Sequence, residues 1–364
     1  MAIAFVAAAA GCLAAPGNTS AITLVSSSTI SGWKLDYYRN TAYPCSISGY
    51  QTFTIATKTG SSPTAAAPLW VFMHGGGAGF FDTTGTPRPD ATQMTEEPAV
   101  NQRSNLSSTT GLLARVRADA AGYRLLAVSY CNRDIYAGTG QTDPNNPNAL
   151  PDGSARTTGG LLATKAAVQY TQAALPTTKT IVHGASAGSV GAYYAAYAMQ
   201  LQGIAPAGVV GDASVLNVEA DNAAYDQGAC RKGDYSPSGQ AAVGARIDPE
   251  VADTANEVDK LVSNGRLTVP LLNVWNHGDV NSCGNHTMSC PLRNGSTTTL
   301  SVTDCEHQPL AAAITAEGTG TTSKNLPLCV STAANPGACD KHQVTVDVAG
   351  LTNTDPSSPA DYLT

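Results

Sequence analysis

Short apolar runs alternate with amphipathic stretches over most of this chain. The run at 69–73 ends at a cluster of glycines, which is typical of a buried central strand. The other predicted strands lie at 33–38, 50–57, 124–130, 179–183, 209–210, 269–275 and 326–330. Helices are predicted at 112–120, 159–174, 189–199, 250–263 and 309–317. This alternation predicts an α/β fold, with a mainly parallel central sheet covered by helices on both faces.

The N-terminal part of the chain has a different composition. No charged residue precedes Lys34, and 3–15 is an apolar run of signal-peptide length. We therefore expect a signal peptide at 1–15, a mobile Ser/Thr-rich lead-in at 16–32 and a single domain at 33–364. The Ala-Ala-Gly-Cys segment ending at Cys12 also resembles a lipoprotein cleavage box, so a lipid anchor at Cys12 is the alternative to simple secretion.

Composition narrows the possible partners and the compartment. The 364 residues carry a net charge of −7 and no basic run, which argues against nucleic acid and anionic membranes as partners. Apart from Cys12 there are eight cysteines, which in an exported protein predict up to four disulfides. The alternative is a metal site, because four potential zinc ligands are closely spaced, although in no familiar zinc-finger pattern: His277, Cys283, His286 and Cys290.

The residues at 184–188 read Gly-Ala-Ser-Ala-Gly and match G-x-S-x-G, the turn that exposes a nucleophilic serine between a strand and a helix. A strand-like run precedes the motif and a predicted helix follows it, as this turn requires. Ser186 is therefore the candidate nucleophile. The alternative is a coincidental turn of small residues.

A glycine-rich loop, His-Gly-Gly-Gly-Ala-Gly at 74–79, follows the strand at 69–73. Loops of this type supply backbone N–H groups to the oxyanion hole of esterases. We expect Gly76 and Gly77 to provide two such donors and Ala187 a third. No P-loop lysine follows the glycines, which argues against a phosphate cradle.

A serine nucleophile needs a base and an acid that orients the base. Asp279 directly follows the strand at 269–275 and is the preferred acid. Asp212 is the competitor, although it fits a turn aspartate equally well. The chain order Ser, Asp, His leaves His307 and His342 open as the base. The other four histidines precede the serine or share the loop of the acid: His74, His183, His277 and His286.

Several segments together resemble the pectin acetylesterase/Notum family of serine carboxylesterases, which belongs to the α/β-hydrolase superfamily. The most specific is Tyr-Cys-Asn-Arg-Asp-Ile-Tyr-Ala-Gly at 130–138, and Cys-Asp-Lys-His-Gln at 339–343 is similar to the segment with the family's catalytic histidine. The resemblance implies a secreted or periplasmic enzyme without a cofactor, with Ser186, Asp279 and His342 as its triad. Its substrate would be a small acyl ester, such as an O-acetylated carbohydrate.

The same resemblance implies a Cys45–Cys131 bridge and structural roles for Asp134 and Asp212. There are two departures from the family pattern. Gly77 stands where relatives often carry a bulky aromatic residue, and the Asp/Asn-rich loop at 141–156 has no counterpart, which leaves calcium binding as an alternative for it.

Other functions also stay open. Within the same enzyme class these are a lipase, a polyester hydrolase or an aromatic-ester hydrolase. Outside it, a non-catalytic binding module on a hydrolase scaffold is the rival interpretation. We expect three long loops to form the rim of the substrate site, namely 74–108, 131–158 and 280–306.

Overall fold

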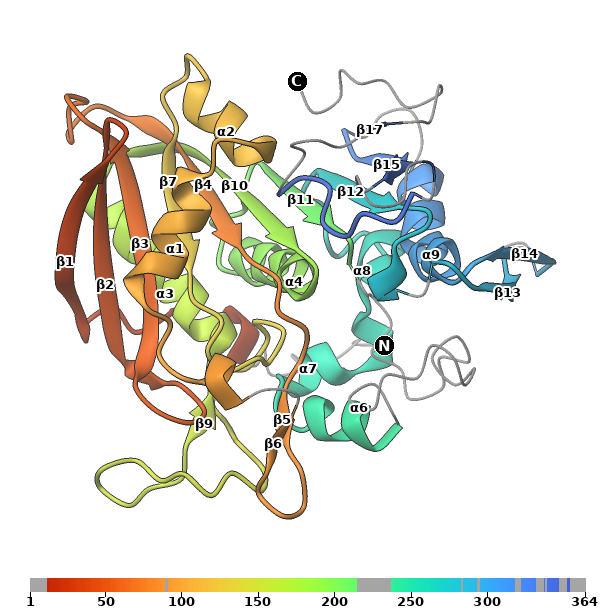
Figure 1. Ribbon diagram of the computed structural model, residues 1–364, viewed down its shortest axis with the longest axis horizontal. Helices are drawn as coiled ribbons and strands as arrows, with labels where there is room; N and C mark the ends of the chain where they lie inside the picture. Colours follow the sequence, from red (N-terminus) through yellow and green to blue (C-terminus); the bar gives the residue numbers. More distant parts are fainter. Residues whose placement is uncertain are drawn as a thin grey trace, which may run out of the picture.

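The computed structural model describes residues 12–88, 91–214, 237–282, 284–292, 295–317, 322–331, 337, 339–346 and 352–353. Within them, nine strands form one sheet (Figure 1). In spatial order they are β1 (Ile22–Ile30), β2 (Trp33–Pro44), β3 (Tyr50–Lys58), β7 (Arg124–Val128), β4 (Ala67–Met73), β10 (Thr177–Ala185), β11 (Gly208–Asp212), β12 (Leu271–Asn276) and β15 (Lys324–Leu328). The strands from β7 to β15 are parallel, whereas β1 to β3 pair antiparallel with each other and with β7.

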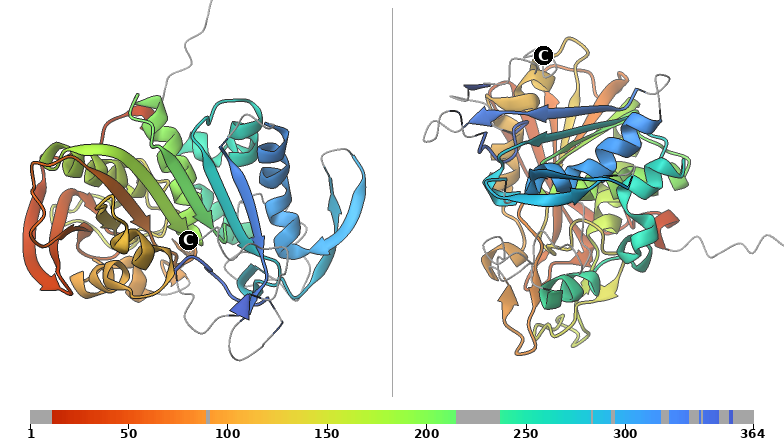
Figure 2. Two further views of the ribbon diagram at one scale, coloured as in Figure 1. Left: turned by 90° about the horizontal axis from the view of Figure 1, so that it is seen from above. Right: turned by 90° about the vertical axis from the view of Figure 1, so that its right-hand side faces the viewer.

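Helices cover both faces of this twisted sheet (Figure 2). They are α1 (Ala99–Ser107), α2 (Gly111–Ala118), α3 (Gly160–Ala174), α4 (Ala187–Leu201), α6 (Pro237–Gly244), α7 (Pro249–Ala252), α8 (Val258–Ser263) and α9 (Val302–Ala316). Single 3₁₀ turns are η1 (Cys12–Ala14), η2 (Ala91–Met94), η4 (Thr254–Asn256) and η5 (Val280–Ser282). Short strands pair as β5 (Phe80–Phe81) with β6 (Pro87–Arg88), β8 (Gln141–Thr142) with β9 (Thr157–Thr158), β13 (Thr287–Pro291) with β14 (Thr297–Ser301), and β16 (Val330–Ser331) with β17 (Thr352–Asn353).

Successive side chains of a strand point to opposite faces of the sheet, so the protein has one hydrophobic core on each face. In β4, Leu69, Val71 and Met73 face the core that contains α3, α4, α8 and α9. Trp70 and Phe72 face the second core, to which α1 and α2 contribute. A strand buried on both faces reads as a continuous apolar run, which is why 69–73 was predictable as a central strand. The predicted parallel sheet with helices on both faces is confirmed.

Three predicted elements need correction. The range 16–32 is not a lead-in, because β1 lies within it and pairs with β2 at the sheet edge, where polar side chains can remain solvated. The helix predicted at 250–263 is three short pieces, since the Asp253 side chain accepts the N–H of Ala255 and begins a new turn. The helix predicted at 309–317 begins at Val302, where Ser301 caps it, and contains Pro309.

Residues 12–15, assigned above to the signal peptide, pack against the domain. Leu13 is buried, and the Lys165 ammonium donates to its carbonyl oxygen at 2.7 Å. The Gln202 amide donates to the carbonyl of Ala14 at 3.1 Å. A signal peptide ending at residue 15 would include these contacts, whereas one ending before Cys12 would not. Residues 1–11 lie outside the described residues.

Among the described residues, three disulfides join segments that are separated along the chain, whereas Cys230 and Cys283 lie outside the described residues. Cys45 and Cys131 are bridged, which confirms the pairing that the family resemblance implied. Cys290–Cys305 ties the β13–β14 hairpin, which projects from the molecule in Figure 1, to α9. Cys329–Cys339 joins the end of β15 to the segment that leads to His342. In the part of the chain that is described, no helix combines the length and apolarity needed to cross a membrane.

Candidate active site

Ser186 occupies a sharp turn between β10 and α4, with φ 56° and ψ −125°. The two flanking glycines are needed because a larger residue would not fit at either position. A Cβ on Gly184 would overlap the carbonyl oxygen of Gly188, and a Cβ on Gly188 would overlap that of Met73. A non-glycine residue at positive φ is strained, and such strain is typical of functional sites. The turn therefore has the geometry that exposes a nucleophilic serine.

The glycine loop lies directly beside this serine. A Cβ on Gly75 would stand only 2.8 Å from the Cβ of Ser186, and Gly77 has a φ of 69°, which favours glycine. The Tyr130 hydroxyl donates to the carbonyl of Gly77 at 2.9 Å. Ala187 is the first residue of α4, where backbone N–H groups have no acceptor within the helix. The structure thus places Gly75, the first glycine of the loop, against the nucleophile turn.

Asp279 and His342 form a buried hydrogen-bonded pair. Asp279 follows β12 and is fully buried, and Nδ1 of His342 donates to its Oδ2 at 2.6 Å. The Asn276 amide holds the histidine segment by donating to the carbonyl of Lys341 at 2.9 Å. The imidazole side chain is 17% exposed, so it borders solvent on one side only. An orienting carboxylate on Nδ1 is what a base for a serine nucleophile requires.

Asp212 connects the serine turn with the histidine segment. Its backbone carbonyl accepts the N–H of Ser186 at 2.7 Å, and its Oδ2 accepts both the N–H and the hydroxyl of Thr345 at 2.6 Å each. Burial raises the pKa of this carboxyl to about 6, although the hydrogen bonds from Thr345 oppose the shift. Asp212 therefore holds the backbone on both sides of the site, while the histidine pairs with Asp279.

His307 is placed differently from His342. It lies within α9, completely buried and stacked on the Trp275 ring with centroids 5.0 Å apart. Its Nδ1 meets Oδ1 of Asn273 at 3.3 Å, and burial lowers its pKa to about 4. His183 is also buried, between Trp70 and Thr345, and burial lowers its pKa to about 3. Both histidines are held as neutral rings inside the cores.

These two rings predict a loss of stability in acid. Both have a folded-state pKa below the unfolded value of about 6.5, so the unfolded chain takes up their protons first as the pH falls below that value. Asp212, with its raised pKa, acts in the opposite direction and offsets part of the loss. For His307 we expect about 2 kcal/mol of unfolding free energy to be lost between pH 7 and pH 5.

Urea unfolding at both pH values, with the wild type and His307→Phe, measures this contribution. The variant should lose about 2 kcal/mol less than the wild type over that interval. His307→Gln, which keeps an amide donor for Asn273 but does not titrate, should show the same smaller loss. Equal losses in all three proteins would contradict the prediction.

Neither metal interpretation gains support from the contacts of its ligands. Cys290 is disulfide-bonded, and Cys283 lies outside the described residues. In the 141–156 loop, both carboxylate oxygens of Asp143 bind the Arg246 guanidinium, at 2.6 and 3.0 Å. Among the residues that the structure describes, no group of three or more His, Cys, Asp or Glu side chains could hold a metal ion.

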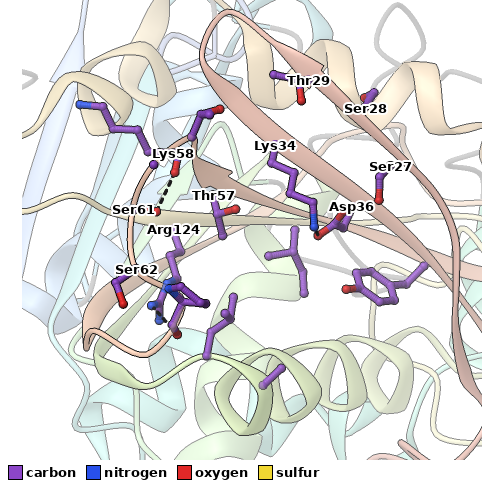
Figure 3. A pocket seen from close by; sticks show the side chains of 17 residues that line it. Ser27, Ser28, Thr29, Lys34, Asp36, Thr57, Lys58, Ser61, Ser62 and Arg124 are labelled. Carbon is purple, nitrogen blue, oxygen red and sulfur yellow. Dashed lines mark hydrogen bonds and ion pairs between the residues drawn. The ribbon is translucent and has the colours of Figure 1, made fainter.

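Two clefts lie at opposite ends of the parallel strands. A cavity of about 610 Å³ adjoins the glycine loop and is lined by Gly75, Gly76 and several polar side chains, among them Glu97 and Arg133. The cleft in Figure 3, of about 500 Å³, is lined instead by Arg124 at the start of β7. Active sites of α/β sheets lie at the carboxyl ends of the strands, where the first cleft lies. Neither Ser186 nor His342 lines this cleft, so it adjoins the candidate triad through the glycine loop.

Three of the charged side chains that line the second cleft have polar partners, namely Lys34, Asp36 and Arg124. Lys34 binds Asp36 at 2.8 Å (Figure 3). The Arg124 guanidinium donates to the carbonyls of Ala65 and Pro176, at 2.6 Å in both bonds.

No family model and no curated protein matches the sequence. Among solved structures, the chain is similar to brefeldin A esterase, a bacterial homologue of human hormone-sensitive lipase, with 16% identity, 84% of this chain and 68% of that chain covered, and a TM-score of 0.40. It is also similar to a thermostable esterase from Pseudomonas putida (14% identity, 87% and 76% covered, TM-score 0.42). A third similar structure is carboxyl esterase 2 from the fungus Tuber melanosporum (12% identity, 84% of this chain and 78% of that chain covered, TM-score 0.44).

The chain has the α/β-hydrolase fold. The sheet order, the serine turn between β10 and α4, and the order Ser186, Asp279, His342 along the chain all agree with it. The activities in the names of the similar proteins belong to those proteins. The pectin acetylesterase/Notum resemblance stays a prediction from the sequence.

Several residues that hold the site could not be predicted from the sequence. Thr345 and Glu97 belong to no motif, and Gln343 belongs only to the segment at 339–343; each acts through a contact that is distant along the chain. Gln343 follows the candidate base, and its side-chain amide packs against Gly75. The sequence contained only a weak indication of their roles, because these polar residues lie next to motifs or inside long loops.

Proposed function

We propose that this protein is a serine carboxylesterase with Ser186 as nucleophile, His342 as base and Asp279 as the acid that orients His342. The observation that carries the proposal is the Asp279–His342 hydrogen bond of 2.6 Å, on a segment fastened by Asp212 to the strained serine turn. A glycine loop beside the same serine completes the set of groups that acyl transfer needs.

In the proposed reaction, the Ser186 hydroxyl oxygen attacks the ester carbonyl while His342 takes the hydroxyl proton. Backbone N–H groups of Gly76, Gly77 and Ala187 stabilise the oxyanion, each worth roughly 3 kcal/mol in comparable sites. The tetrahedral intermediate expels the alcohol, which receives the proton from His342. Water then attacks the acyl-enzyme with His342 as base, and the carboxylic acid leaves. The protein's own residues suffice for each step.

We further propose that the substrate is a small acyl ester, with an acetylated carbohydrate as the first candidate. The family resemblance at 130–138 and 339–343 supports it, as does the polar lining of the 610 Å³ cavity beside the glycine loop. The three disulfides are consistent with action outside the cytoplasm. Export, by cleavage or with a lipid anchor at Cys12, remains part of the proposal.

Hydrolysis of p-nitrophenyl esters from acetyl to dodecanoyl tests the reaction and the acyl size together. We expect the highest kcat/KM for acetyl, with activity falling as the chain lengthens, and release of acetate from acetylated polysaccharide. A maximum on long chains would favour a lipase or polyester hydrolase. A folded protein with no activity on any ester would contradict the proposal and favour the binding module.

A further inference from the structure

His74 is the first residue of the glycine loop and lines the cavity beside it. Its Nδ1 lies 2.7 Å from the carbonyl oxygen of Gly75, and its Nε2 lies 3.0 Å from Oε2 of Glu97. A carbonyl oxygen can only accept a hydrogen bond, and an ionised carboxylate likewise only accepts. Both ring nitrogens must therefore donate, which makes His74 an imidazolium ion.

The Gly75 carbonyl belongs to the peptide unit that also carries the N–H of Gly76. In a planar trans peptide the C=O and the N–H point in opposite directions. A hydrogen bond that fixes the Gly75 carbonyl on the side of His74 therefore turns the Gly76 N–H to the other side. Gly75 itself lies against Ser186, so this peptide borders the place where the oxyanion would form.

Glu97 is anchored independently of His74. Its backbone carbonyl accepts the hydroxyl of Tyr37 at 2.6 Å and that of Thr52 at 3.3 Å, so strands β2 and β3 hold it in place. The Glu97 side chain is 10% exposed and the His74 side chain 26%. A charge pair this shielded is stronger than one on the open surface.

We infer that the His74–Glu97 ion pair orients the Gly76 N–H toward the oxyanion hole. When His74 loses its proton, this N–H is no longer held in that orientation. The inference rests on the proposed function, because it assigns a purpose to one of the proposed oxyanion donors. His74 acts through the peptide and need not touch the substrate.

The surroundings of His74 support the charged form. Its burial lowers the pKa, but the Glu97 charge and the hydrogen bonds to Glu97 and Gly75 outweigh this and raise it above the ordinary value. Arg133 opposes the shift from the other side of the cavity. The remaining ionisable groups nearby are Glu96, which binds Arg39 at 2.9 and 3.0 Å, and two tyrosine rings with centroids 6.0 Å (Tyr130) and 6.4 Å (Tyr136) from the imidazole.

The sign of the pH effect follows from these contacts. Below the pKa of His74, both hydrogen bonds exist and the Gly76 N–H is held in place. Above it, one ring nitrogen presents a lone pair to an acceptor, and the pair with Glu97 or the bond to Gly75 is lost. The wild type should therefore lose kcat at alkaline pH while KM changes little, because the oxyanion forms only after binding.

The test is the pH profile of kcat and KM for p-nitrophenyl acetate with four proteins. In His74→Phe, which keeps a ring but no donor, we expect kcat to fall about 10- to 100-fold with KM within about threefold, somewhat less than the loss of a whole oxyanion donor. In Glu97→Gln, which removes the charge but keeps an acceptor, the alkaline loss should move to lower pH. Asp36→Asn, which removes a carboxylate paired with Lys34 in the cleft of Figure 3, should keep the wild-type profile.

Labelling by a fluorophosphonate separates this inference from the proposed function. If the wild type neither hydrolyses the ester nor labels at Ser186, the proposed function fails. If the wild type is active, the positioning role is overturned by His74→Phe retaining at least half of kcat. The positioning role is also overturned if His74→Phe loses kcat/KM through a higher KM instead of a lower kcat. It is likewise overturned if Glu97→Gln loses kcat at the same alkaline pH as the wild type. Thermal unfolding of each variant shows whether a fall in kcat comes from unfolding. If His74→Phe proves to be unfolded, His74→Gln, which keeps an amide donor group, takes its place under the same criteria.

Discussion

Replacing His342 with alanine is expected to lower kcat/KM for p-nitrophenyl acetate by at least about 10⁴-fold, because the serine then has no base to take its proton. Ser186→Ala should be equally inactive. The double variant should be no worse than either single one, since the two side chains act as a unit. Asp279→Asn, which leaves the geometry but favours the wrong tautomer of His342, should lose about 10⁴-fold.

The matched control for this prediction is His307→Gln. His307 was the other base that the sequence allowed, and it is buried against Trp275 inside α9. The variant should keep kcat/KM within about threefold, since changes away from the reacting groups seldom remove transition-state binding. An active His342→Ala together with an inactive, folded His307→Gln would reverse the assignment. Circular dichroism and thermal unfolding establish that each variant is folded.

Arg246→Met is expected to destabilise the protein by about 3–5 kcal/mol, the range for breaking a buried ion pair from one side. Arg246 and Asp143 are both completely shielded from solvent, with Nε and Oδ1 at 2.6 Å. The guanidinium also donates to the carbonyl of Gly79, to that of Asn132 at 2.7 Å and to the Ser46 hydroxyl at 2.8 Å. Its removal leaves a buried carboxylate and three further acceptors without their donor.

Urea unfolding at pH 7 measures this loss. The control is Lys34→Met, which breaks the exposed pair with Asp36 and should cost at most about 1 kcal/mol. Replacing both members of the buried pair, Arg246→Met with Asp143→Leu, should recover part of the stability, since no unpaired charge then remains in the interior. The prediction would be contradicted if the free energy of unfolding of Arg246→Met lay within 1 kcal/mol of the wild-type value. Because Arg246 holds Gly79 at the end of the glycine loop, the same variant should also lower kcat.

The local patterns of the sequence were sufficient for the fold and for the motifs made of consecutive residues. A strand that is buried on both faces must be apolar throughout, so 69–73 was recognisable without its neighbours. The turn around Ser186 requires glycines at 184 and 188, and the glycine loop follows directly from the end of β4. In both motifs the residues that create the conformation are neighbours along the chain.

Helix and strand boundaries were less predictable where a side chain competes with the periodic pattern. Serines in β1 concealed an edge strand, because an edge strand can leave polar side chains in water. Asp253 interrupted the helix predicted at 250–263, since its carboxylate caps the 3₁₀ turn η4 instead of continuing α7. Pro309 marked no boundary at all, because α9 continues through it.

Only the tertiary structure decided which of His307 and His342 pairs with Asp279. Their spacing from Asp279 allowed both, and the pairing depends on contacts across large sequence separations. The Cys329–Cys339 bridge and the Asn276 amide bring the segment of His342 to Asp279, whereas α9 buries His307 in the core. In the same way, the pairing of Glu97 with His74 and of Arg246 with Asp143 exists only after folding. Sequence determined which chemical groups were available; the long-range contacts of the fold decided which of them meet.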